Sequence, residues 1–379
     1  MITGSRAEYG LLSGLLREIN AEKTLKLNLV VTGSHFSEKH GHSISEIEDD
    51  GFTVFAKIPL IEPDSSEISV SIAVADGLKS FAELFCKFRP DLLILLGDRF
   101  EIFSAAIAAH IQRIPIAHIH GGETTQGLID EAFRHSITKM SQLHFVANDS
   151  YRNRVIQMGE VPSSVFTVGG LGVDMIARTA LLTRSELENI LGLSFSKRNL
   201  LVTYHPVTLH ENSDEFGILL DSLSEIQNTQ MIFTLPNADP NNEPIRQAIL
   251  EFEKSKENVH VFESLGYRNY LSCLANVDAV VGNSSSGLLE APTLRIPSVN
   301  IGDRQKGRLS ASSVINCRGN KKEIINAIDK IYSPDFNKVI KETVNPYGQP
   351  GAAKKIINII MGQSLDNLIV KQFYDLRPR

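Results

Sequence analysis

A cluster of side chains that can exchange or hold protons lies between residues 98 and 135. Its members are Asp98, Arg99, Glu101, His118, His120, Glu123, Asp130, Glu131, Arg134 and His135. Removing a proton from carbon and returning one to the opposite face requires at least two positioned acid–base groups. Neighbouring carboxylates also shift each other's pKa, so that one site can hold both an acid and a base. We therefore predict catalysis by residues of this cluster, with Asp98, His120, Glu123, Asp130 and Glu131 as the candidates. In the alternative interpretation, some of these carboxylates pair with the two arginines and only shape the loop.

The segment Gly282-Asn283-Ser284-Ser285-Ser286-Gly287 has the composition of an anion-binding turn. It follows an apolar run and precedes a helix expected from Leu288 onward. Small residues let the backbone approach a ligand, hydroxyl groups donate hydrogen bonds, and a helix N-terminus favours an anion. These features suit a diphosphate, although Ser and Asn are also ordinary helix caps that need no ligand. Glu290, in the same helix, could accept hydrogen bonds from ribose hydroxyls, or it could lie on a solvated helix face.

Three arginines lie near the expected ends of strands. Arg6 belongs to the turn GSRAE, and Arg304 and Arg308 belong to GDRQKGR. A guanidinium group can form forked contacts with phosphate oxygens. A single arginine is more often part of a surface salt bridge, but three at such positions favour phosphate binding. His205 also follows an apolar run and is a further candidate for the site.

The spacing of His118, His120 and Glu123 could suggest a metal site. Residues two apart on a strand point the same way only while the strand continues, and Gly121-Gly122 is expected to end it. The sequence has no HExxH motif and no cysteine partner for these residues. We therefore expect neither a catalytic metal nor another cofactor.

Short apolar runs precede these functional segments and are continuous rather than alternating. Such runs are typical of strands buried on both faces of a parallel sheet. They are Leu27–Val31, Leu92–Leu96, Ile114–Ile119, Leu143–Val146, Leu200–Thr203, Met231–Thr234, Val259–Phe262, Ala279–Val281 and Pro297–Ile301. Since ligands of open parallel sheets bind beyond the carboxyl ends of the strands, the polar residues after each run are expected to gather there.

Helical spacing separates the apolar runs, most clearly in Ile102–Ile111, Ala132–Met140 and Glu215–Ile226. This alternation predicts right-handed βαβ units and an α/β fold with doubly wound sheets. The pattern fades around Gly169–Met175 and then restarts, and 379 residues exceed one core of typical size. We predict two domains, residues 1–170 and 171–350, followed by a helical tail, residues 351–379. Because GSRAE follows only three residues, the first strand is either very short or begins before the first residue given.

The composition excludes several classes of protein. The formal net charge is −6, so no global basic field exists for binding nucleic acid or an acidic membrane surface. No apolar run approaches the roughly 20 residues of a membrane helix. The three cysteines stand far apart without a CxxC pair, which suits a reducing compartment. We expect a cytoplasmic protein with neither a nucleic acid nor a membrane as partner.

Eight motifs occur in order along nearly the whole chain. They are GSRAEYG (4–10), VTGSH (31–35), LLGDRFEIF (95–103), HIHGGE (118–123), DEAFRHSITKMSQLH (130–144), YHP (204–206), GNSSSGLLEAP (282–292) and NIGDRQKGR (300–308). Together they resemble the UDP-N-acetylglucosamine 2-epimerases, specifically the hydrolysing branch used to make sialic-acid-type sugars. Each motif alone is modest, whereas eight in order at fitting separations are highly specific.

The resemblance implies two Rossmann-like domains facing each other across a cleft, the arrangement of the B class of glycosyltransferases. The first domain would carry the acid–base cluster and the second would bind UDP. The C-terminal tail would dock back on the first domain. A UDP-sugar would be the substrate, and the protein would be a homo-oligomer, either a dimer or a tetramer.

The resemblance also implies a two-step reaction. A base removes the proton at C2 of the sugar while UDP leaves from C1, and water and a proton then add to the resulting glycal. Roles carry over to individual positions. Asp98 matches the essential acid after a strand, and Asp130 the carboxylate that opens the DExxxRH segment. On the UDP side, the family's diphosphate contacts match Ser284, Ser285 and Ser286, next to Gly287. The ribose contact matches Glu290. Further UDP-binding positions match Arg6, His205, Arg304 and Arg308.

One position departs from the family pattern. Some relatives have a catalytic glutamate where this chain has His120. In this chain a glutamate, Glu123, follows three residues later. Histidine itself exchanges protons near neutral pH, so the chemistry is retained in principle. The sequence does not assign the base and the acid among His120, Glu123 and Asp130.

Three alternatives stay open on the sequence alone. The same chemistry could act on UDP-N,N′-diacetylbacillosamine, a precursor of legionaminic acid. The fold would also permit a glycosyltransferase, which would need an acceptor sugar and fewer acid–base groups. A UDP-sugar-binding protein without chemistry would bind the nucleotide and release no product.

Overall fold

The computed structural model describes residues 1–36, 43–60, 67–124, 129–205, 215–236, 243–366 and 368–376. The chain divides into two compact units. The first unit comprises Met1–Met175 and Gly348–Arg379, and the second comprises Ile176–Tyr347. Both units consist of parallel strands and helices, so the expected α/β class is confirmed. The chain passes from one unit to the other after Met175 and again before Gly348, a few residues from the boundaries expected at 170/171 and 350/351.

The first unit contains seven strands among the described residues, and every pairing is parallel. They are β1 (Ile2–Thr3), β2 (Leu29–Thr32), β3 (Val54–Ile58), β4 (Leu93–Leu96), β5 (Ile116–Ile119), β6 (Leu143–Val146) and β7 (Val165–Thr167). Hydrogen bonds join β1-β2-β3 and β4-β5-β6-β7, and β1 lies beside β4. The order is therefore β3-β2-β1-β4-β5-β6-β7, the doubly wound order that reverses between β1 and β4. The first strand has only two residues.

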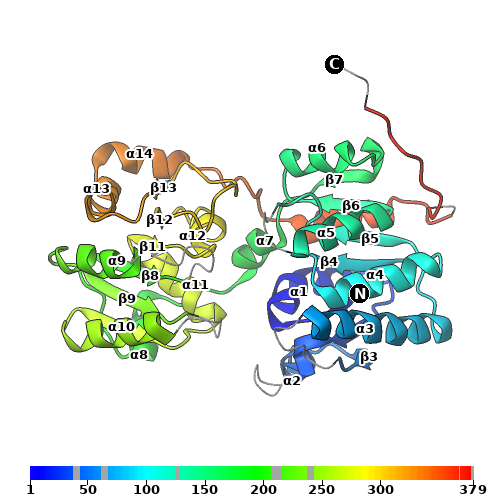
Figure 1. The fold of residues 1–379 in the computed structure, drawn as a ribbon, viewed down its shortest axis with the longest axis horizontal. Helices are drawn as coiled ribbons and strands as arrows, with labels where there is room; N and C mark the ends of the chain where they lie inside the picture. Colours follow the sequence, from blue (N-terminus) through cyan, green and yellow to red (C-terminus); the bar gives the residue numbers. More distant parts are fainter. Residues whose placement is uncertain are drawn as a thin grey trace. The chain divides into compact units, whose positions relative to one another are not determined.

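Helices cover both faces of this sheet (Figure 1). They are α1 (Arg6–Ala21), α2 (Ile44–Asp49), α3 (Glu67–Lys87), α4 (Phe100–Ile111), α5 (Ile129–Met140), α6 (Asp149–Gln157), α7 (Leu171–Arg178) and α15 (Ala352–Met361). One hydrophobic core packs α1 and α15 against Leu96, Ile119 and other residues of β2, β4, β5 and β6. A second core packs α3, α4 and α5 against the opposite face, which includes Leu95. Burial on both faces explains why these strands are continuous apolar runs.

The C-terminal segment belongs to the first unit. The helix α15 packs against α1, and Asp174 accepts hydrogen bonds from the backbone N–H groups of Gly351 (2.5 Å) and Ala353 (3.0 Å). The expectation of a wholly helical tail is wrong, because α15 ends at Met361 and residues 370–376 are not helical. Residues 370–376 run on with neither helix nor strand, drawn in red in Figure 1, and the Tyr374 N–H donates to the Gly159 carbonyl at 2.9 Å.

The second unit has six parallel strands among its described residues. They are β8 (Asn199–Thr203), β9 (Gln230–Thr234), β10 (Val259–Phe262), β11 (Ala279–Gly282), β12 (Ser298–Ile301) and β13 (Val314–Cys317). Their order is β10-β9-β8-β11-β12-β13, which reverses between β8 and β11 as the first unit's order reverses between β1 and β4. Two doubly wound Rossmann-type units are thus confirmed.

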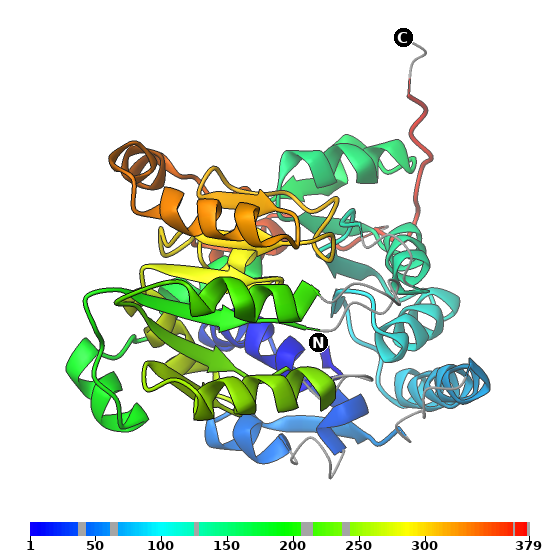
Figure 2. The same cartoon turned by 60° about the vertical axis from the view of Figure 1, so that its left-hand side comes forward.

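Two layers of helices enclose the second sheet. They are α8 (Arg184–Leu191), α9 (Glu215–Ser224), α10 (Glu243–Lys254), α11 (Tyr267–Asn276), α12 (Ser286–Leu289), α13 (Lys321–Ile331) and α14 (Pro334–Glu342). The helices α9, α10 and α13 share one core with the face of Val202 and Val281 and lie in front of the strands in Figure 2. The helices α8 and α11 pack on the other face, which carries Leu201 and Val280.

The helix expected from Leu288 onward is placed differently. It spans only Ser286–Leu289, a single turn, and Glu290 is its C-terminal cap. Four residues carry too small a dipole for the predicted N-terminal anion site to rest on it. Any anion binding by this segment therefore depends on its hydroxyl and backbone N–H groups.

No helix among the described residues is long and apolar enough to cross a membrane.

Candidate active site

The turns after β1 and β4 meet where the strand order of the first unit reverses. Glu101, in the first turn of α4, is fully buried and reaches back to the turns that follow β1 and β2. A Cβ atom at Gly4 or Gly33 would overlap the Glu101 carboxylate, so these two positions require glycine. The Arg99 Nε–H donates to Glu101 Oε1 at 2.6 Å. One buried carboxylate therefore fixes the turns that carry the predicted Arg6 and Asp98.

A second buried carboxylate, Glu8, lies in the same place. Its Oε2 accepts a hydrogen bond from the Gly4 N–H at 2.6 Å. Burial, together with the charge of Glu101, raises the pKa of Glu8 to about 8. Burial raises the pKa of Glu101 as well. Two carboxylates packed together in a dry site disfavour double ionisation, so this pair holds a proton at neutral pH.

Arg134 lies at the centre of the predicted acid–base cluster. Its side chain is 5% exposed. The guanidinium group pairs with the Asp98 carboxylate and donates to Glu131 Oε2 at 3.0 Å and to the Glu123 carbonyl at 2.8 Å. Three of the five predicted catalytic residues thus surround one buried cation, at the carboxyl ends of β4 and β5.

Asp130 belongs to the same cluster. Burial, together with the negative charge of Asp98, raises its pKa, and the positive charges of Arg134 and Arg99 oppose this rise. A carboxyl group with a raised pKa retains its proton more readily than an ordinary aspartate does, which suits proton exchange.

His120 and Glu123 form a further pair. His120 follows β5 with a φ of 66°, which turns the chain out of the strand. Its Nδ1 lies 3.7 Å from Glu123 Oε1, and its Nε2 accepts from the Leu171 N–H at 3.3 Å. The accepting Nε2 leaves the proton of the neutral ring on Nδ1, which faces the carboxylate.

His118 lies apart from His120 in a different environment. It is fully buried on β5, and its Nε2–H donates to the Gly97 carbonyl at 2.8 Å. Its Nδ1 lies 3.1 Å from Thr138 Oγ1. Burial lowers the pKa of His118 to about 3, so the ring is neutral. Among the described residues, no group of three or more histidine, cysteine or carboxylate side chains could hold a metal ion.

In the second unit, Asn283 bridges the two strands at which the order reverses. Its Oδ1 accepts from the His205 N–H and its Nδ2 donates to the His205 carbonyl, both at 2.8 Å. Gly282 has a φ of 137°, and a Cβ there would overlap the Thr203 carbonyl. The segment expected to bind a diphosphate is therefore fixed against the end of β8.

The serines of this segment differ in their surroundings. Ser284 and Ser285 are partly exposed, whereas Ser286 is buried and its Oγ accepts from the Tyr270 hydroxyl at 2.7 Å. The Glu290 carboxyl group lies beside Ser286, and burial raises its pKa. A hydroxyl-lined turn and a buried carboxylate are thus adjacent, as recognition of a diphosphate joined to a ribose requires.

The predicted arginines are placed unequally. Arg304 donates to the Asn283 carbonyl at 3.0 Å, and Gln305 donates to the same oxygen at 2.8 Å. Arg304 thus lies beside the serine-rich turn. Arg308 follows in the next turn and is partly exposed. Arg6, in the first unit, pairs with Glu46 at 2.9 Å and is largely exposed.

Several residues of these sites were not among the predicted catalytic and UDP-binding residues, although Glu101 and Arg134 were named in the acid–base cluster and Asn283 in the expected anion-binding turn. Glu8 and Glu101 hold the first unit's turns, Arg134 and Asn283 organise the two clusters, and Tyr270 reaches Ser286 from α11. The motif GNSSSG contains the sequence signal for Asn283. The role of Glu8 could not be predicted without knowing that β1 and β4 are adjacent. Pro206, within the motif YHP, lies outside the described residues.

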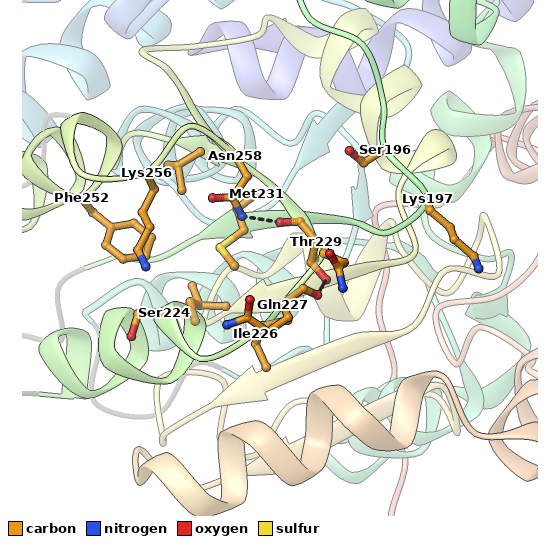
Figure 3. A pocket seen from close by; sticks show the side chains of 13 residues that line it. Ser196, Lys197, Ser224, Ile226, Gln227, Thr229, Met231, Phe252, Lys256 and Asn258 are labelled. Carbon is orange, nitrogen blue, oxygen red and sulfur yellow. Dashed lines mark hydrogen bonds between the residues drawn. The ribbon is translucent and has the colours of Figure 1, made fainter.

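A pocket of about 480 Å³ lies elsewhere in the second unit (Figure 3). It lies where β9 and β10 begin, and Thr229, Met231, Phe252, Lys256 and Asn258 are among its lining residues. The Asn258 side chain donates to the Thr229 carbonyl at 2.6 Å, so these polar groups satisfy each other. The pocket is at the opposite end of the strands from His205 and is separate from the predicted site.

Comparison with known proteins identifies the chain's relatives. The model of the family described as UDP-N-acetylglucosamine 2-epimerase matches residues 17–361. The chain is 38% identical over 379 residues to the polysialic acid biosynthesis protein P7 of Escherichia coli, covering 99% of this chain and 96% of that protein. It is 36% identical over 380 residues to a GDP/UDP-N,N′-diacetylbacillosamine 2-epimerase (hydrolyzing) of Campylobacter jejuni, covering 99% and 98%.

Solved structures give the same fold. The crystal structure of a UDP-GlcNAc 2-epimerase from Neisseria meningitidis bound to UDP-GlcNAc superposes with a TM-score of 0.78. The two sequences are 20% identical, and the match covers 96% of this chain and 99% of that one. At this level of identity the likeness establishes the fold alone.

Proposed function

Because the chain belongs to the UDP-N-acetylglucosamine 2-epimerase family, it is a UDP-sugar 2-epimerase of the hydrolysing kind, and we propose that its substrate is UDP-N-acetylglucosamine. The products are N-acetylmannosamine and UDP. The observation that carries the proposal is the cluster of Asp98, Glu131 and the Glu123 backbone around Arg134, with Asp130 beside it. A group of this kind supplies the acid and the base that epimerisation at carbon requires.

The reaction has two steps. In the first, the C2–H bond breaks, its electron pair forms the C1=C2 double bond, and UDP leaves with the electron pair of the C1–O bond. In the second, water adds its hydroxyl group at C1 of the glycal, and a proton adds to C2 from the opposite face. The base of the first step and the acid of the second act on opposite faces of the sugar.

We divide the two proton transfers at C2 between two pairs in the first unit. One pair is Asp98 and Asp130, and the other is His120 with Glu123. The raised pKa of Asp130 supports its part, because this carboxyl group exchanges its proton nearer to neutral pH than an exposed aspartate does. The contact of His120 Nδ1 with Glu123 Oε1 at 3.7 Å supports the other, since it brings a histidine, a residue type that can exchange protons, next to a carboxylate. Glu131 assists by holding Arg134.

The second unit binds the UDP part of the substrate in this proposal. The partly exposed hydroxyls of Ser284 and Ser285 and the backbone at Gly287 contact the diphosphate, and Arg304 adds charge from beside the same turn. Glu290 accepts hydrogen bonds from the ribose hydroxyls. His205, Arg308 and, from the first unit, Arg6 are further UDP contacts. Exposed ion pairs such as that of Arg6 with Glu46 contribute little, so Arg6 can exchange its partner for a phosphate.

A second substrate is supported by a specific comparison. The Campylobacter jejuni relative carries N,N′-diacetylbacillosamine in its name and is 36% identical over nearly the whole chain. The two sugars differ at C4 and C6, whereas the chemistry occurs at C1 and C2. The same acid–base groups would therefore serve UDP-N,N′-diacetylbacillosamine, and the product would supply legionaminic acid synthesis. With UDP-N-acetylglucosamine the product would supply sialic acid synthesis, a role that the polysialic acid relative supports.

We further propose that the enzyme is a cytoplasmic homo-oligomer, a dimer or a tetramer. Free Cys86, Cys273 and Cys317 support a reducing compartment. Exposed Ile68 and Ile72 of α3, four residues apart and each more than half accessible, support a subunit interface in the first unit. Light scattering after size exclusion would give the oligomeric state.

Release of UDP from the two candidate substrates, with no acceptor sugar present, tests the proposed function. We expect turnover with UDP-N-acetylglucosamine. Turnover only with UDP-N,N′-diacetylbacillosamine would mean that the substrate is that sugar nucleotide and that the same mechanism acts on it. If UDP appeared only after an acceptor sugar was added, the enzyme would be a glycosyltransferase and the proposal would be wrong.

A further inference from the structure

Glu290 is a buried carboxyl group with an unused oxygen. No described group donates a hydrogen bond to its Oε2 atom, which is inaccessible to solvent. Burial raises the pKa of Glu290. An acceptor buried without a partner costs free energy, and such groups in folded proteins call for a specific explanation. Since solvent does not reach this oxygen, neighbouring protein groups set the position of the carboxyl group.

Tyr270 and Ser286 control the surroundings of this carboxyl group. The Tyr270 hydroxyl donates to Ser286 Oγ at 2.7 Å. Because Ser286 accepts this bond, the single proton of its own hydroxyl stays available for another acceptor. The Ser286 hydroxyl lies close enough to Glu290 to stabilise the charged carboxylate and so lower its pKa, although burial outweighs this effect. The Tyr270 hydroxyl is thus bonded to Ser286, whose own hydroxyl lies beside the Glu290 carboxyl group.

The backbone around Glu290 is fixed without help from Tyr270. The Glu290 N–H donates to the Ser286 carbonyl at 3.0 Å, and Ser298 Oγ donates to the Gly287 carbonyl at 2.7 Å. The Asn345 side chain donates to the Leu289 carbonyl at 2.8 Å. Loss of the Tyr270 hydroxyl would therefore alter the side-chain contacts of Ser286 and Glu290 and leave the backbone of this turn in place.

We propose that Tyr270 is a positioning residue for ribose recognition. Its hydroxyl orients Ser286, and Ser286 holds the Glu290 carboxylate in position to accept hydrogen bonds from the ribose hydroxyls of UDP. Ser286 then acts on UDP through Glu290, unlike Ser284 and Ser285. The inference rests on the proposed function, because it takes Glu290 to be the ribose contact.

Calorimetric titration with two nucleotides tests this inference. The ligands are UDP and 2′,3′-dideoxy-UDP, which lacks both ribose hydroxyls. The proteins are the wild type, Tyr270→Phe, Glu290→Gln and the double variant. We expect Tyr270→Phe to weaken UDP binding about fivefold, the usual effect of losing one hydrogen bond in a network, and to leave dideoxy-UDP binding within about twofold. The double variant should bind UDP no more weakly than Glu290→Gln does, because both changes act on the same carboxyl group.

Tyr332→Phe is the matched control, since it removes another half-buried tyrosine hydroxyl of the same unit. Its binding of both ligands should equal the wild type. Equal weakening of both ligands by Tyr270→Phe would mean a structural role and would overturn the inference. Unchanged UDP binding by Tyr270→Phe, or a wild type that binds the two nucleotides equally, would overturn it as well. A wild type that bound neither nucleotide would instead contradict the proposed function.

Discussion

The Nε2 atom of His118 lies 2.8 Å from the carbonyl oxygen of Gly97, so a side chain of β5 holds the turn that follows β4. Asp98 is the next residue of that turn. His118 is neutral because burial lowers its pKa to about 3, and its Nε2 proton stays in place for this bond at all physiological pH values. The position of the predicted catalytic aspartate thus depends on a buried histidine of β5 whose ring also contacts Thr138 of α5.

The first prediction concerns this bond. Replacing His118 by alanine removes the donor to Gly97 and leaves a cavity, so we expect the free energy of unfolding to fall by about 2–3 kcal/mol. We also expect kcat to fall about tenfold or more, because Asp98 loses its fixed position. Urea unfolding and initial rates measure the two effects. His110→Ala, on the exposed end of α4, is the control, and an unchanged kcat in His118→Ala would show that the turn needs no such support.

The second prediction concerns the Asp98–Arg134 pair. We expect Asp98→Asn to lower kcat about 100-fold or more, which is the usual contribution of a general acid or base. Arg134→Lys should lower kcat by a similar factor, because one ammonium group cannot replace the contacts to Asp98, Glu131 and the Glu123 carbonyl. The double variant should lose much less than the product of the two factors. Strictly multiplicative losses in a double-mutant cycle would mean that the two residues act independently.

The third prediction concerns the buried Glu8. Its pKa is raised to about 8 in the folded chain by burial and by Glu101, against an ordinary value of 4.5. Between these two values the folded chain holds a proton that the unfolded chain has lost. The free energy of unfolding should therefore fall as pH rises through this window, by at most about 1.4 kcal/mol per pH unit for one group. Three charged neighbours also act on the pKa of Glu8. The carboxylates of Glu101 and Asp98 raise it, and the Arg99 guanidinium group lowers it.

Glu8→Gln removes this titration and tests the assignment. Urea unfolding between pH 5 and pH 8 should show a smaller decline in stability for Glu8→Gln than for the wild type. The exposed Glu83→Gln variant of α3 should follow the wild type. Parallel pH profiles for Glu8→Gln and the wild type would contradict a protonated Glu8.

The fourth prediction concerns the C-terminal segment. Glu160 is almost fully buried and is bound by Lys371 (2.7 Å), Lys139 (2.6 Å) and His144 (3.0 Å). Burial alone would raise the pKa of Glu160, but the hydrogen bonds from these three residues outweigh burial and lower it to about 2. Lys371→Met should therefore lower the free energy of unfolding by about 1–3 kcal/mol at pH 7.

The pH dependence of that loss has a definite sign. A lowered carboxylate pKa contributes stability above the ordinary value of 4.5 that disappears as pH falls toward 2. The difference between Lys371→Met and the wild type should accordingly shrink below about pH 4.5. Lys354→Met, at an exposed position of α15, is the control. A variant at Lys371 as stable as the wild type at pH 7 would show that the Lys371–Glu160 ion pair contributes nothing to stability.

The central strands were predictable because burial on both faces demands continuous apolar sequence. The run Leu143–Val146 coincides with β6, and Leu200–Thr203 lies within β8 (Asn199–Thr203). The pattern missed β3, whose residues alternate in exposure, and β7 and β13, most of whose residues are at least partly exposed. All three are edge strands of their sheets, where one neighbour is lacking and the apolar requirement is weaker.

The candidate site was predictable where its residues are close in sequence. Asp98 and the residues around Asp130 follow neighbouring strands, so their clustering could be inferred from the run of motifs. Glu8 and Glu101 are more than 90 positions apart and meet only because β1 lies beside β4. Tyr270 has the pattern of an ordinary helix residue, and its role depends on the position of Ser286. Sequence patterns encode which elements form, whereas these contacts depend on the order of the strands.

Proton NMR of the reaction in deuterated water tests the central claim most directly. The purified protein is incubated with UDP-N-acetylglucosamine, and a parallel sample receives UDP-N,N′-diacetylbacillosamine. We predict the release of UDP together with a 2-epimer that carries deuterium at C2, because the C2 proton is removed and replaced from solvent. A product that retained its original C2 hydrogen would contradict proton abstraction at C2. Failure to release UDP from either substrate, despite measurable UDP binding, would contradict the hydrolysing epimerase itself.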